Sequence, residues 1–150
     1  MVLVFPSTII KTQYDPSLFL GIFSGSNPSS SNNQWWYRSD TGQIIQNING
    51  TLVPMIESST ILIIDTNQTI HDTTINDNIL VMPNTTLTIY GNIIFNGTVT
   101  ILNGATLLSS NPNASSSSPS INNYYFTQNI YLNGTYSIAQ YNQDNLNYST

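Results

Sequence analysis

The feature that most constrains the fold is an alternation of apolar and polar side chains over residues 79–108, ILVMPNTTLTIYGNIIFNGTVTILNGATLL. A period of two residues is that of a β-strand, because successive side chains leave a pleated backbone on opposite faces. Thr, Ile and Val, which are frequent here, fit a half-buried pleat well. Gly91, Gly97 and Gly104 interrupt the alternation where a chain can turn tightly. The segment therefore predicts strands joined by turns, and we expect an all-β protein.

Two arrangements of these strands fit the pattern. In an antiparallel β-sandwich or jelly roll, Asn96-Gly97 would be a type I′ turn, and residues 92–102 would form a β-hairpin. In a parallel β-solenoid, the same glycines would mark the corners of coils that repeat at about 20 residues.

Self-similarity along the chain favours the solenoid. Ile61, Val81 and Ile101 lie 20 residues apart, and Thr86-Leu87 returns as Thr106-Leu107 at the same interval. We therefore expect a parallel β-solenoid-like core with an extended N-terminal arm, and we keep the antiparallel β-sandwich or jelly roll as the alternative.

Changes in composition divide the chain into five segments. The first carries Val2, Val4 and Phe5, and Pro6 excludes it from the centre of a sheet. It is expected to be an edge strand of the same domain, or an arm that pairs with another subunit by β-augmentation. The segments are an extended N-terminal arm (1–23), a Ser/Asn spacer with an aromatic cluster (24–39), a β-core (40–108), a Ser-rich linker (109–120) and a Tyr-rich β-segment (121–150).

Three consecutive aromatic residues, Trp35, Trp36 and Tyr37, follow the first spacer. In an extended chain they alternate between the two faces, so at least one ring would point outward. They either close one end of the core, anchor a neighbouring subunit, or stack on a sugar. Together with Val2, Val4 and Phe5 they are the interface or glycan-contact candidates of the sequence.

The surface is expected to be nearly free of charge. Only 6% of residues are charged, against about 25% in ordinary soluble domains, and Lys11 and Arg38 are the only lysine and arginine. A basic patch for nucleic acid is excluded by this composition. A surface of amides and hydroxyls depends little on carboxyl ionisation and lacks the charge repulsion that keeps proteins apart. Such a chain suits acidic surroundings and assembly with copies of itself.

Catalytic and metal-binding patterns are weak. His71 lies beside Asp72, with Asp65 and Asp77 nearby, but no zinc-type spacing, nucleophile elbow or P-loop is present. The chain has no cysteine, and no apolar run is long enough for a transmembrane helix. We expect no enzyme, no catalytic residue, no bound metal, no cofactor and no membrane span.

Asparagine followed by any residue except proline and then by Ser or Thr forms a glycosylation sequon, and the chain has several. Their number is little above what the Asn, Ser and Thr content gives by chance, and tight turns need Asn-Gly in any case. The possible N-glycosylation sites are Asn49, Asn67, Asn84, Asn96, Asn113, Asn133 and Asn147.

The stretch NTTLTIYGNIIFNGTVTILNGATLLSS resembles the repeats of β-solenoid surface proteins of the tail-spike and adhesin kind. The composition, poor in charge and rich in Asn, Ser, Thr, Ile and Tyr, is similar to that of surface and virion proteins of thermoacidophilic archaea and their viruses. The resemblance implies a structural or attachment role and supplies no catalytic residue.

These observations predict a non-enzymatic structural subunit of a homo-oligomeric virion exterior, such as a tail, spike or fibre. A start at Met1 without a signal peptide favours a virion protein assembled inside its host. The alternatives are a secreted or cell-surface filament or surface-layer subunit assembled by strand exchange, and a carbohydrate-binding module. The expected partners are copies of the chain, other virion or surface structural proteins and host surface glycans.

Overall fold

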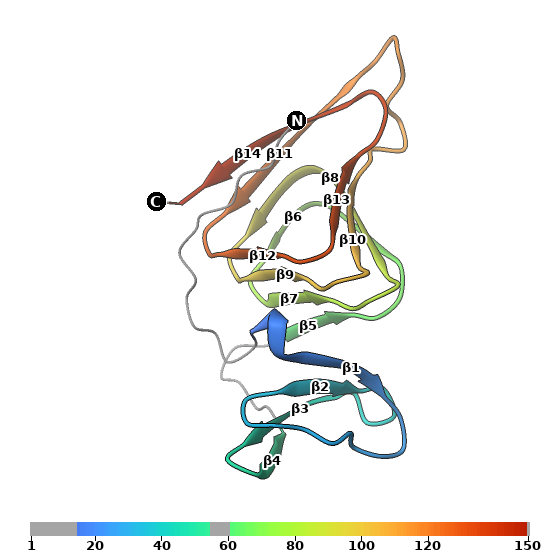
Figure 1. The fold of residues 1–150 in the computed structure, drawn as a ribbon. Coiled ribbons are helices and arrows are strands. Elements are labelled where there is room, and N and C mark those ends of the chain that lie inside the picture. Colours follow the sequence, from blue (N-terminus) through green and yellow to red (C-terminus); the bar gives the residue numbers. More distant parts are fainter. Residues whose placement is uncertain (1–14, 55–60, 150) are drawn as a thin grey trace. The chain divides into compact units, whose positions relative to one another are not determined.

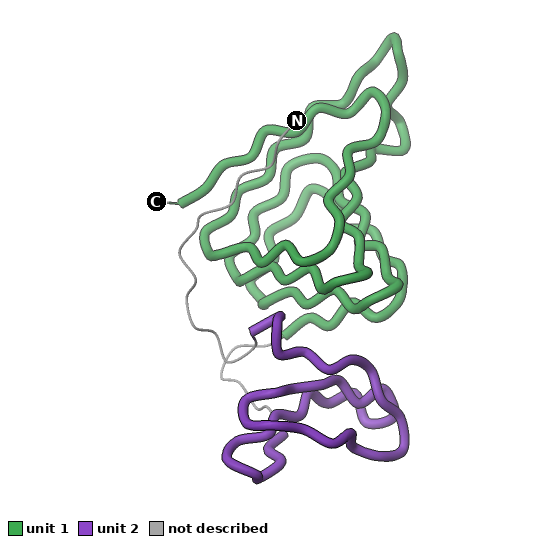
Figure 2. The backbone as a smooth tube through the Cα atoms, in the orientation of Figure 1, with its two compact units in different colours: residues 1–8, 59–150 green, residues 9–58 purple. Residues whose placement is uncertain are grey.

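The computed structural model describes residues 15–54 and 61–149, which form two separate compact units (Figures 1 and 2). Both units are built from β-strands, and within the described residues the only helix is a single 3₁₀ turn, η1 (Pro16–Leu18). Asp15 caps this turn by accepting a hydrogen bond of 2.9 Å from the Ser17 N–H. The expectation of an all-β protein is confirmed for the described residues.

The unit of residues 15–54 is a four-stranded sheet in the order β1-β2-β3-β4. β1 pairs with β2 in parallel, and the two following pairs are antiparallel. β3 and β4 form a hairpin at Asn49-Gly50, where φ is +52° and +88°, as a type I′ turn requires. The strands are β1 (Phe19–Phe23), β2 (Trp35–Arg38), β3 (Gln43–Ile48) and β4 (Thr51–Pro54).

The unit of residues 61–149 contains two sheets, and every strand pair in them is parallel. The antiparallel sandwich is therefore wrong for this unit. The first sheet has the order β12-β9-β7-β5: β5 (Ile61–Ile64), β7 (Asn78–Val81), β9 (Val99–Ile101) and β12 (Ile130–Leu132). The second, curled sheet contains β6 (Gln68–Ile75), β8 (Thr86–Phe95), β10 (Thr106–Ser109), β11 (Ser120–Phe126), β13 (Thr135–Ile138) and β14 (Asn142–Tyr148).

The long strand β8 joins the parts of the second sheet. Its first half pairs with β10, its second half pairs with β11, and β6 runs along both halves. The register with β6 shifts between His71 and Thr73, beside Gly91, where φ is +79°. Two outer strands complete the sheet, since β13 pairs with β10 and β14 pairs with β11.

The repeat seen in the sequence is partly reproduced by the register. Thr86 pairs with Thr106, and Val81 pairs with Ile101, as the 20-residue interval predicts. On its other side, however, Val81 pairs with Ile64 and not with Ile61, so the 20-residue interval is wrong for β5. The periodicity is therefore real but interrupted by turns of different length.

Asn96-Gly97 is not a hairpin turn, because the strands that it joins, β8 and β9, lie in different sheets. Gly97 is needed here for close packing. A Cβ atom on it would lie 2.5 Å from the Asp77 carbonyl oxygen and 2.7 Å from the Asn78 nitrogen, atoms of the preceding turn of chain. Gly134 has the same role, since its Cβ would lie 2.4 Å from the Ala105 carbonyl oxygen.

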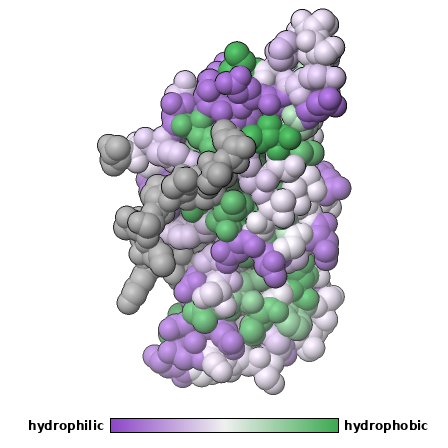
Figure 3. Space-filling view, turned by 45° about the horizontal axis from the view of Figure 1, so that its top comes forward, coloured by the Kyte–Doolittle hydropathy of each residue, from purple (hydrophilic) through white to green (hydrophobic). Residues whose placement is uncertain are grey.

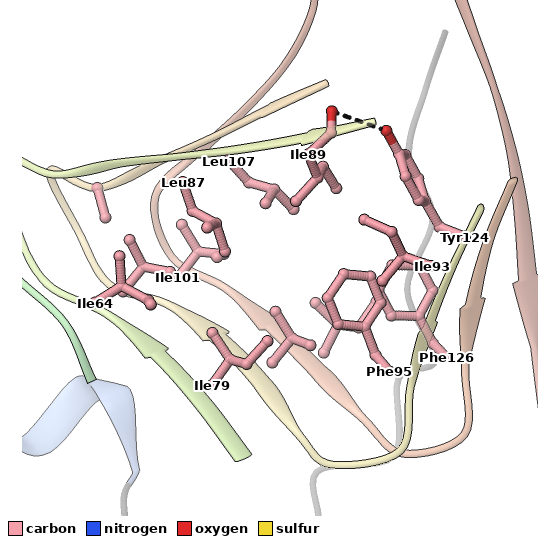
Figure 4. Packing of buried hydrophobic residues seen from close by; sticks show 14 residues of the cluster. Ile64, Ile79, Leu87, Ile89, Ile93, Phe95, Ile101, Leu107, Tyr124 and Phe126 are labelled. Atoms are coloured by element: carbon pink, nitrogen blue, oxygen red, sulfur yellow. Dashed lines mark hydrogen bonds between the residues drawn. The ribbon is translucent and has the colours of Figure 1, made fainter. Parts of the chain in front are cut away.

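The core of this unit lies between the two sheets (Figure 4). Side chains of the same kind lie above one another, as in the pair Leu87 and Leu107. Phe126 stacks on Phe95 on one side and on Tyr148 on the other, with ring centroids 5.0 and 5.7 Å apart. Each fully buried Ile, Leu or Phe contributes about 1.5–3 kcal/mol through removal of apolar surface from water.

The two units divide the chain differently from the expected segments. The expected β-core over 40–108 contains strands of both units, β3 and β4 in one and β5 to β10 in the other. Residues 110–119, within the expected linker, form a loop between β10 and β11 of a single sheet. Of the expected arm, β1 is an edge strand, whereas residues 1–14, with Val2, Val4 and Phe5, lie outside the described residues.

We predict that Gly97→Ala lowers the free energy of unfolding by about 1–3 kcal/mol, since the added methyl group overlaps backbone atoms that cannot rotate away. Urea unfolding followed by circular dichroism measures the change. Asn103→Ala, at an exposed position of the next turn, is the control and should change stability by less than about 0.5 kcal/mol. Equal effects of the two substitutions would contradict the close approach at Gly97.

Candidate functional site

The aromatic residues singled out in the sequence are buried residues of the unit of residues 15–54. Trp35 and Trp36 are completely buried, and Tyr37 is 5% exposed. Trp35 donates its indole N–H to the Asp15 carbonyl oxygen at 2.8 Å and packs against Phe19. The expectation that one ring points outward is wrong, because both faces of β2 are covered. These side chains cannot stack on a sugar in this conformation.

A polar link connects this aromatic core to the surface. The Asn27 side-chain oxygen accepts hydrogen bonds from the Trp36 indole at 3.2 Å and from Arg38 Nη1 at 2.8 Å. Arg38 also pairs with Asp40 through two contacts of 2.8 and 2.5 Å. The hydrogen bond from Arg38 lowers the pKa of Asp40 to about 2, with a further contribution from the Gly25 N–H.

We predict that Arg38→Gln raises the pKa of Asp40 toward its ordinary value of 3.8. Because the folded-state pKa is depressed, the pair stabilises the fold above about pH 3.8, and this stabilisation is lost as the pH falls through about 2. A carboxyl titration by NMR measures the midpoint. Asn27→Ala, which leaves the Arg38–Asp40 contacts in place, is the control, and an unchanged midpoint in Arg38→Gln would contradict the assignment.

The strongest concentration of buried polar groups lies in the unit of residues 61–149. We name it the polar cluster: Ser109, Asn122, Tyr124, Tyr136 and Asp144. Its members come from four strands, β10, β11, β13 and β14. The strand register brings them together. Asn122 on β11 pairs with Asp144 on β14, and Ser109 on β10 pairs with Ile89 on β8.

Asp144 is the acceptor at the centre of the polar cluster, and it is 5% exposed. One carboxyl oxygen accepts hydrogen bonds from Ser109 at 2.7 Å and from Asn122 at 3.1 Å, and the other accepts from the Tyr136 hydroxyl. Ser109 lies 2.6 Å from the Tyr124 hydroxyl, which also donates to the Ile89 carbonyl oxygen at 3.1 Å (Figure 4). A buried carboxyl group with this many donors satisfies the rule for buried polar groups.

The two tyrosines of the polar cluster act as hydrogen-bond donors. Burial raises the pKa of Tyr124 and of Tyr136 well above the ordinary value, and for Tyr136 the hydrogen bond to Asp144 adds to the effect. Both hydroxyl groups therefore stay protonated at neutral pH. The arrangement ties four strands to one carboxyl group, which is a structural use of polar side chains.

We predict that Tyr136→Phe lowers the free energy of unfolding by about 1–3 kcal/mol, because it removes a donor from a buried carboxyl oxygen. Tyr125→Phe is the matched control, since that hydroxyl belongs to a ring that is 44% exposed, and the change should stay within about 0.5 kcal/mol. Urea unfolding measures both. A Tyr136→Phe protein as stable as the control would show that this bond does not hold the strands.

The polar cluster was not anticipated from the sequence. Ser109 and Asp144 are 35 residues apart, and no short motif connects them. One signal was available, because Asp144 is the only charged residue between 120 and 149 and lies among tyrosines and asparagines. A single acid in an otherwise uncharged segment is a reason to look for buried donors.

Of the residues considered for metal binding, Asp65, His71 and Asp72 are exposed and Asp77 is half-buried. His71 Nδ1 is 3.2 Å from Asp72, and the imidazole stacks on Tyr90 with centroids 4.5 Å apart. The Asn92 N–H, at 3.0 Å, is the main cause of a lowered pKa of Asp72, followed by His71. Among the described residues, no three His, Cys, Asp or Glu side chains are grouped so that they could hold a metal ion.

All seven asparagines of the glycosylation sequons are exposed, in turns, in the loop 110–119 or on the outer face of β14. Asn67 accepts a hydrogen bond from the Thr86 N–H at 2.9 Å, and Asn96 bonds to Asn76 at 2.8 Å. The other sequon asparagines are Asn49, Asn84, Asn113, Asn133 and Asn147.

The surface mixes small apolar and hydrophilic areas, as the face in Figure 3 shows. Exposed large apolar residues include Ile94 on β8 and Ile121 on β11. Within the described part of the chain, no helix has the length and apolar character needed to cross a membrane. Comparison with protein-family models, with curated proteins and with solved structures finds no match to this chain.

Proposed function

We propose that this protein is a non-enzymatic structural subunit of a homo-oligomeric virion exterior, such as a tail, spike or fibre, and that residues 61–149 form a parallel β-solenoid. Its partners in this proposal are copies of itself and other virion structural proteins, with host surface glycans as candidates for attachment. The observation that carries the proposal is the use of polar side chains to bond one turn of chain to the next.

Three hydrogen bonds support the solenoid, each joining residues 20 apart. One lies at the bend within β6 and β8, and two lie where these strands end. The Asn92 N–H donates to Asp72 at 3.0 Å, and the Thr98 N–H donates to Asn78 at 2.9 Å. Asn96 and Asn76 form the third bond, between their side chains. A chain that advances by one strand spacing for each such interval describes coils, which is the geometry of a solenoid.

A row of asparagines on the outer face supports a structural role. Asn123 donates to Asn92 at 2.9 Å, and Asn145 donates to Asn123 at 3.0 Å. An amide is both donor and acceptor, so such rows reinforce stacked strands without introducing charge. Fixed stacks with uncharged surfaces are suited to repeated assembly on the outside of a particle.

Native mass spectrometry of the purified full chain is the first test, and we expect a defined homo-oligomer with unmodified asparagines. Sedimentation velocity over a wide concentration range checks that the assembly is not produced by the measurement. A monomer at every concentration would refute the homo-oligomeric subunit.

A second candidate is a secreted or cell-surface filament or surface-layer subunit that assembles by strand exchange. The exposure of every sequon asparagine favours it, because glycosylation needs accessible side chains. Glycan mass on the native protein, together with long polymers of unequal length, would favour the filament over the virion part. The carbohydrate-binding module loses its support, since Trp35, Trp36 and Tyr37 are buried.

A further inference from the structure

We propose that Asn103-Gly104 is a site of spontaneous covalent modification, at which the asparagine side chain closes on the glycine nitrogen and converts to aspartate or isoaspartate. This chemistry is independent of the proposed function. The chain contains four Asn-Gly pairs, and their surroundings single out this one. The other three are Asn49-Gly50, Asn96-Gly97 and Asn133-Gly134.

The reaction needs only the chain, a base and water. The base removes the proton of the Gly104 N–H, and the nitrogen attacks Cγ, the side-chain carbonyl carbon of Asn103. The new N–Cγ bond closes a five-membered succinimide ring. The bond from Cγ to the side-chain nitrogen breaks, and that nitrogen keeps the electron pair, takes a proton and leaves as ammonia. Water then adds to one ring carbonyl and breaks its bond to the ring nitrogen, which gives aspartate by addition at Cγ and isoaspartate by addition at the main-chain carbon.

Asn103 and Gly104 are the two central residues of a type II β-turn. The Ala105 N–H donates to the Leu102 carbonyl oxygen at 2.9 Å, φ is negative at Asn103, and φ is +86° at Gly104. Both central residues are exposed. Neither the Gly104 N–H nor the Asn103 carbonyl oxygen has a hydrogen-bond partner among the described residues. The peptide between them can therefore rotate while the bond that closes the turn stays in place.

Rotation of this peptide is what ring closure requires. At the first central residue of a type II turn ψ is about +120°, which turns the following nitrogen away from the side chain. Gly104 can follow the rotation because glycine accepts positive and negative φ equally well. Since Gly104 has no side chain, nothing on it obstructs the approach of its nitrogen to Asn103.

Two of the other pairs are held by hydrogen bonds from the glycine nitrogen itself. The Gly50 N–H donates to the Asn47 side-chain oxygen at 2.8 Å, and the Gly134 N–H donates to the Ile101 carbonyl oxygen at 2.9 Å. Each bond has to break before the nitrogen can attack. A hydrogen bond of ordinary strength therefore slows the reaction by up to about tenfold.

The pair Asn96-Gly97 is held by packing and by its side chain. Gly97 is buried so closely that a Cβ atom on it would lie 2.5 Å from the Asp77 carbonyl oxygen. The Asn96 side chain donates to the Asn76 side-chain oxygen at 2.8 Å. Rotation of this peptide would disturb both contacts, so this pair is protected as well.

Modification at Asn103 would alter a turn that is bonded to the segments on both sides of it. The Gly104 carbonyl oxygen accepts from the Asn84 N–H, and the Ala105 carbonyl oxygen accepts from the Thr135 N–H, both at 2.9 Å. Isoaspartate lengthens the main chain by one methylene group within this turn, and either product adds a carboxylate. Because ammonia is lost, the asparagine does not form again. The modified fraction therefore increases with the age of the protein.

Site-resolved mass spectrometry tests the proposal. The full chain, produced without glycans in a bacterial host, is incubated folded in a mildly alkaline buffer and then cleaved with pepsin in acid, which stops the reaction. The same incubation in concentrated urea gives the rate of each pair without the fold. In the folded protein we expect Asn103 to react about tenfold faster than Asn49 and Asn133, whereas in urea the rates should be similar.

Asn103→Gln is the matched variant, because it keeps an exposed amide but would have to close a larger and less favourable ring. It should abolish most of the ammonia released by the folded protein, and circular dichroism confirms that it folds. Aged wild-type protein should unfold at a lower urea concentration than fresh protein, and aged Asn103→Gln should not. A folded-state rate at Asn103 no higher than at Asn49 and Asn133, or unchanged ammonia release in Asn103→Gln, would overturn the proposal.

Discussion

The parallel register of β8 with its neighbours is the constraint on which the unit of residues 61–149 depends. Thr86 opposite Thr106 places apolar residues above apolar residues in the interior and amides above amides outside. A slip of one residue would exchange the two faces and put asparagine into the core. The buried aromatic stack, the outer row of asparagines and the polar cluster all require this one alignment.

Much of the strand content was predictable, because alternation of side chains is a local property of the sequence. The direction of pairing was not, and Asn-Gly-Thr shows why. At Asn49 the tripeptide forms a hairpin turn with two positive φ angles, and at Asn96 it joins strands of different sheets. Gly50 allows the positive φ of the hairpin turn, whereas Gly97 allows the backbone of Asp77 and Asn78 to approach closely. The two tripeptides differ in the segments that pack beside them, and a local sequence pattern does not contain this information.

Burial was the least predictable property of the candidate sites. Trp35, Trp36 and Tyr37 occupy successive positions of one strand, and alternation assigns them to opposite faces. That one face would be exposed was an assumption, and it is wrong because β2 is covered on both. The polar cluster was missed for the opposite reason, since Asp144 looks like a surface residue. Its donors come from strands far apart in sequence, and only the fold brings them together.

The loop of residues 110–119 has a consequence for how this chain can vary. β6 bends at Asp72 and β8 bends at Gly91, and both continue as strands beyond the bend. At the corresponding place between β10 and β11, the chain has a loop of ten residues. The strands on both sides keep their register with β8, and the loop is closed on itself by hydrogen bonds between Ser115 and Ser118. Loop length is thus uncoupled from stacking. This corner is a place where a foreign peptide could be grafted and displayed with little cost to the fold.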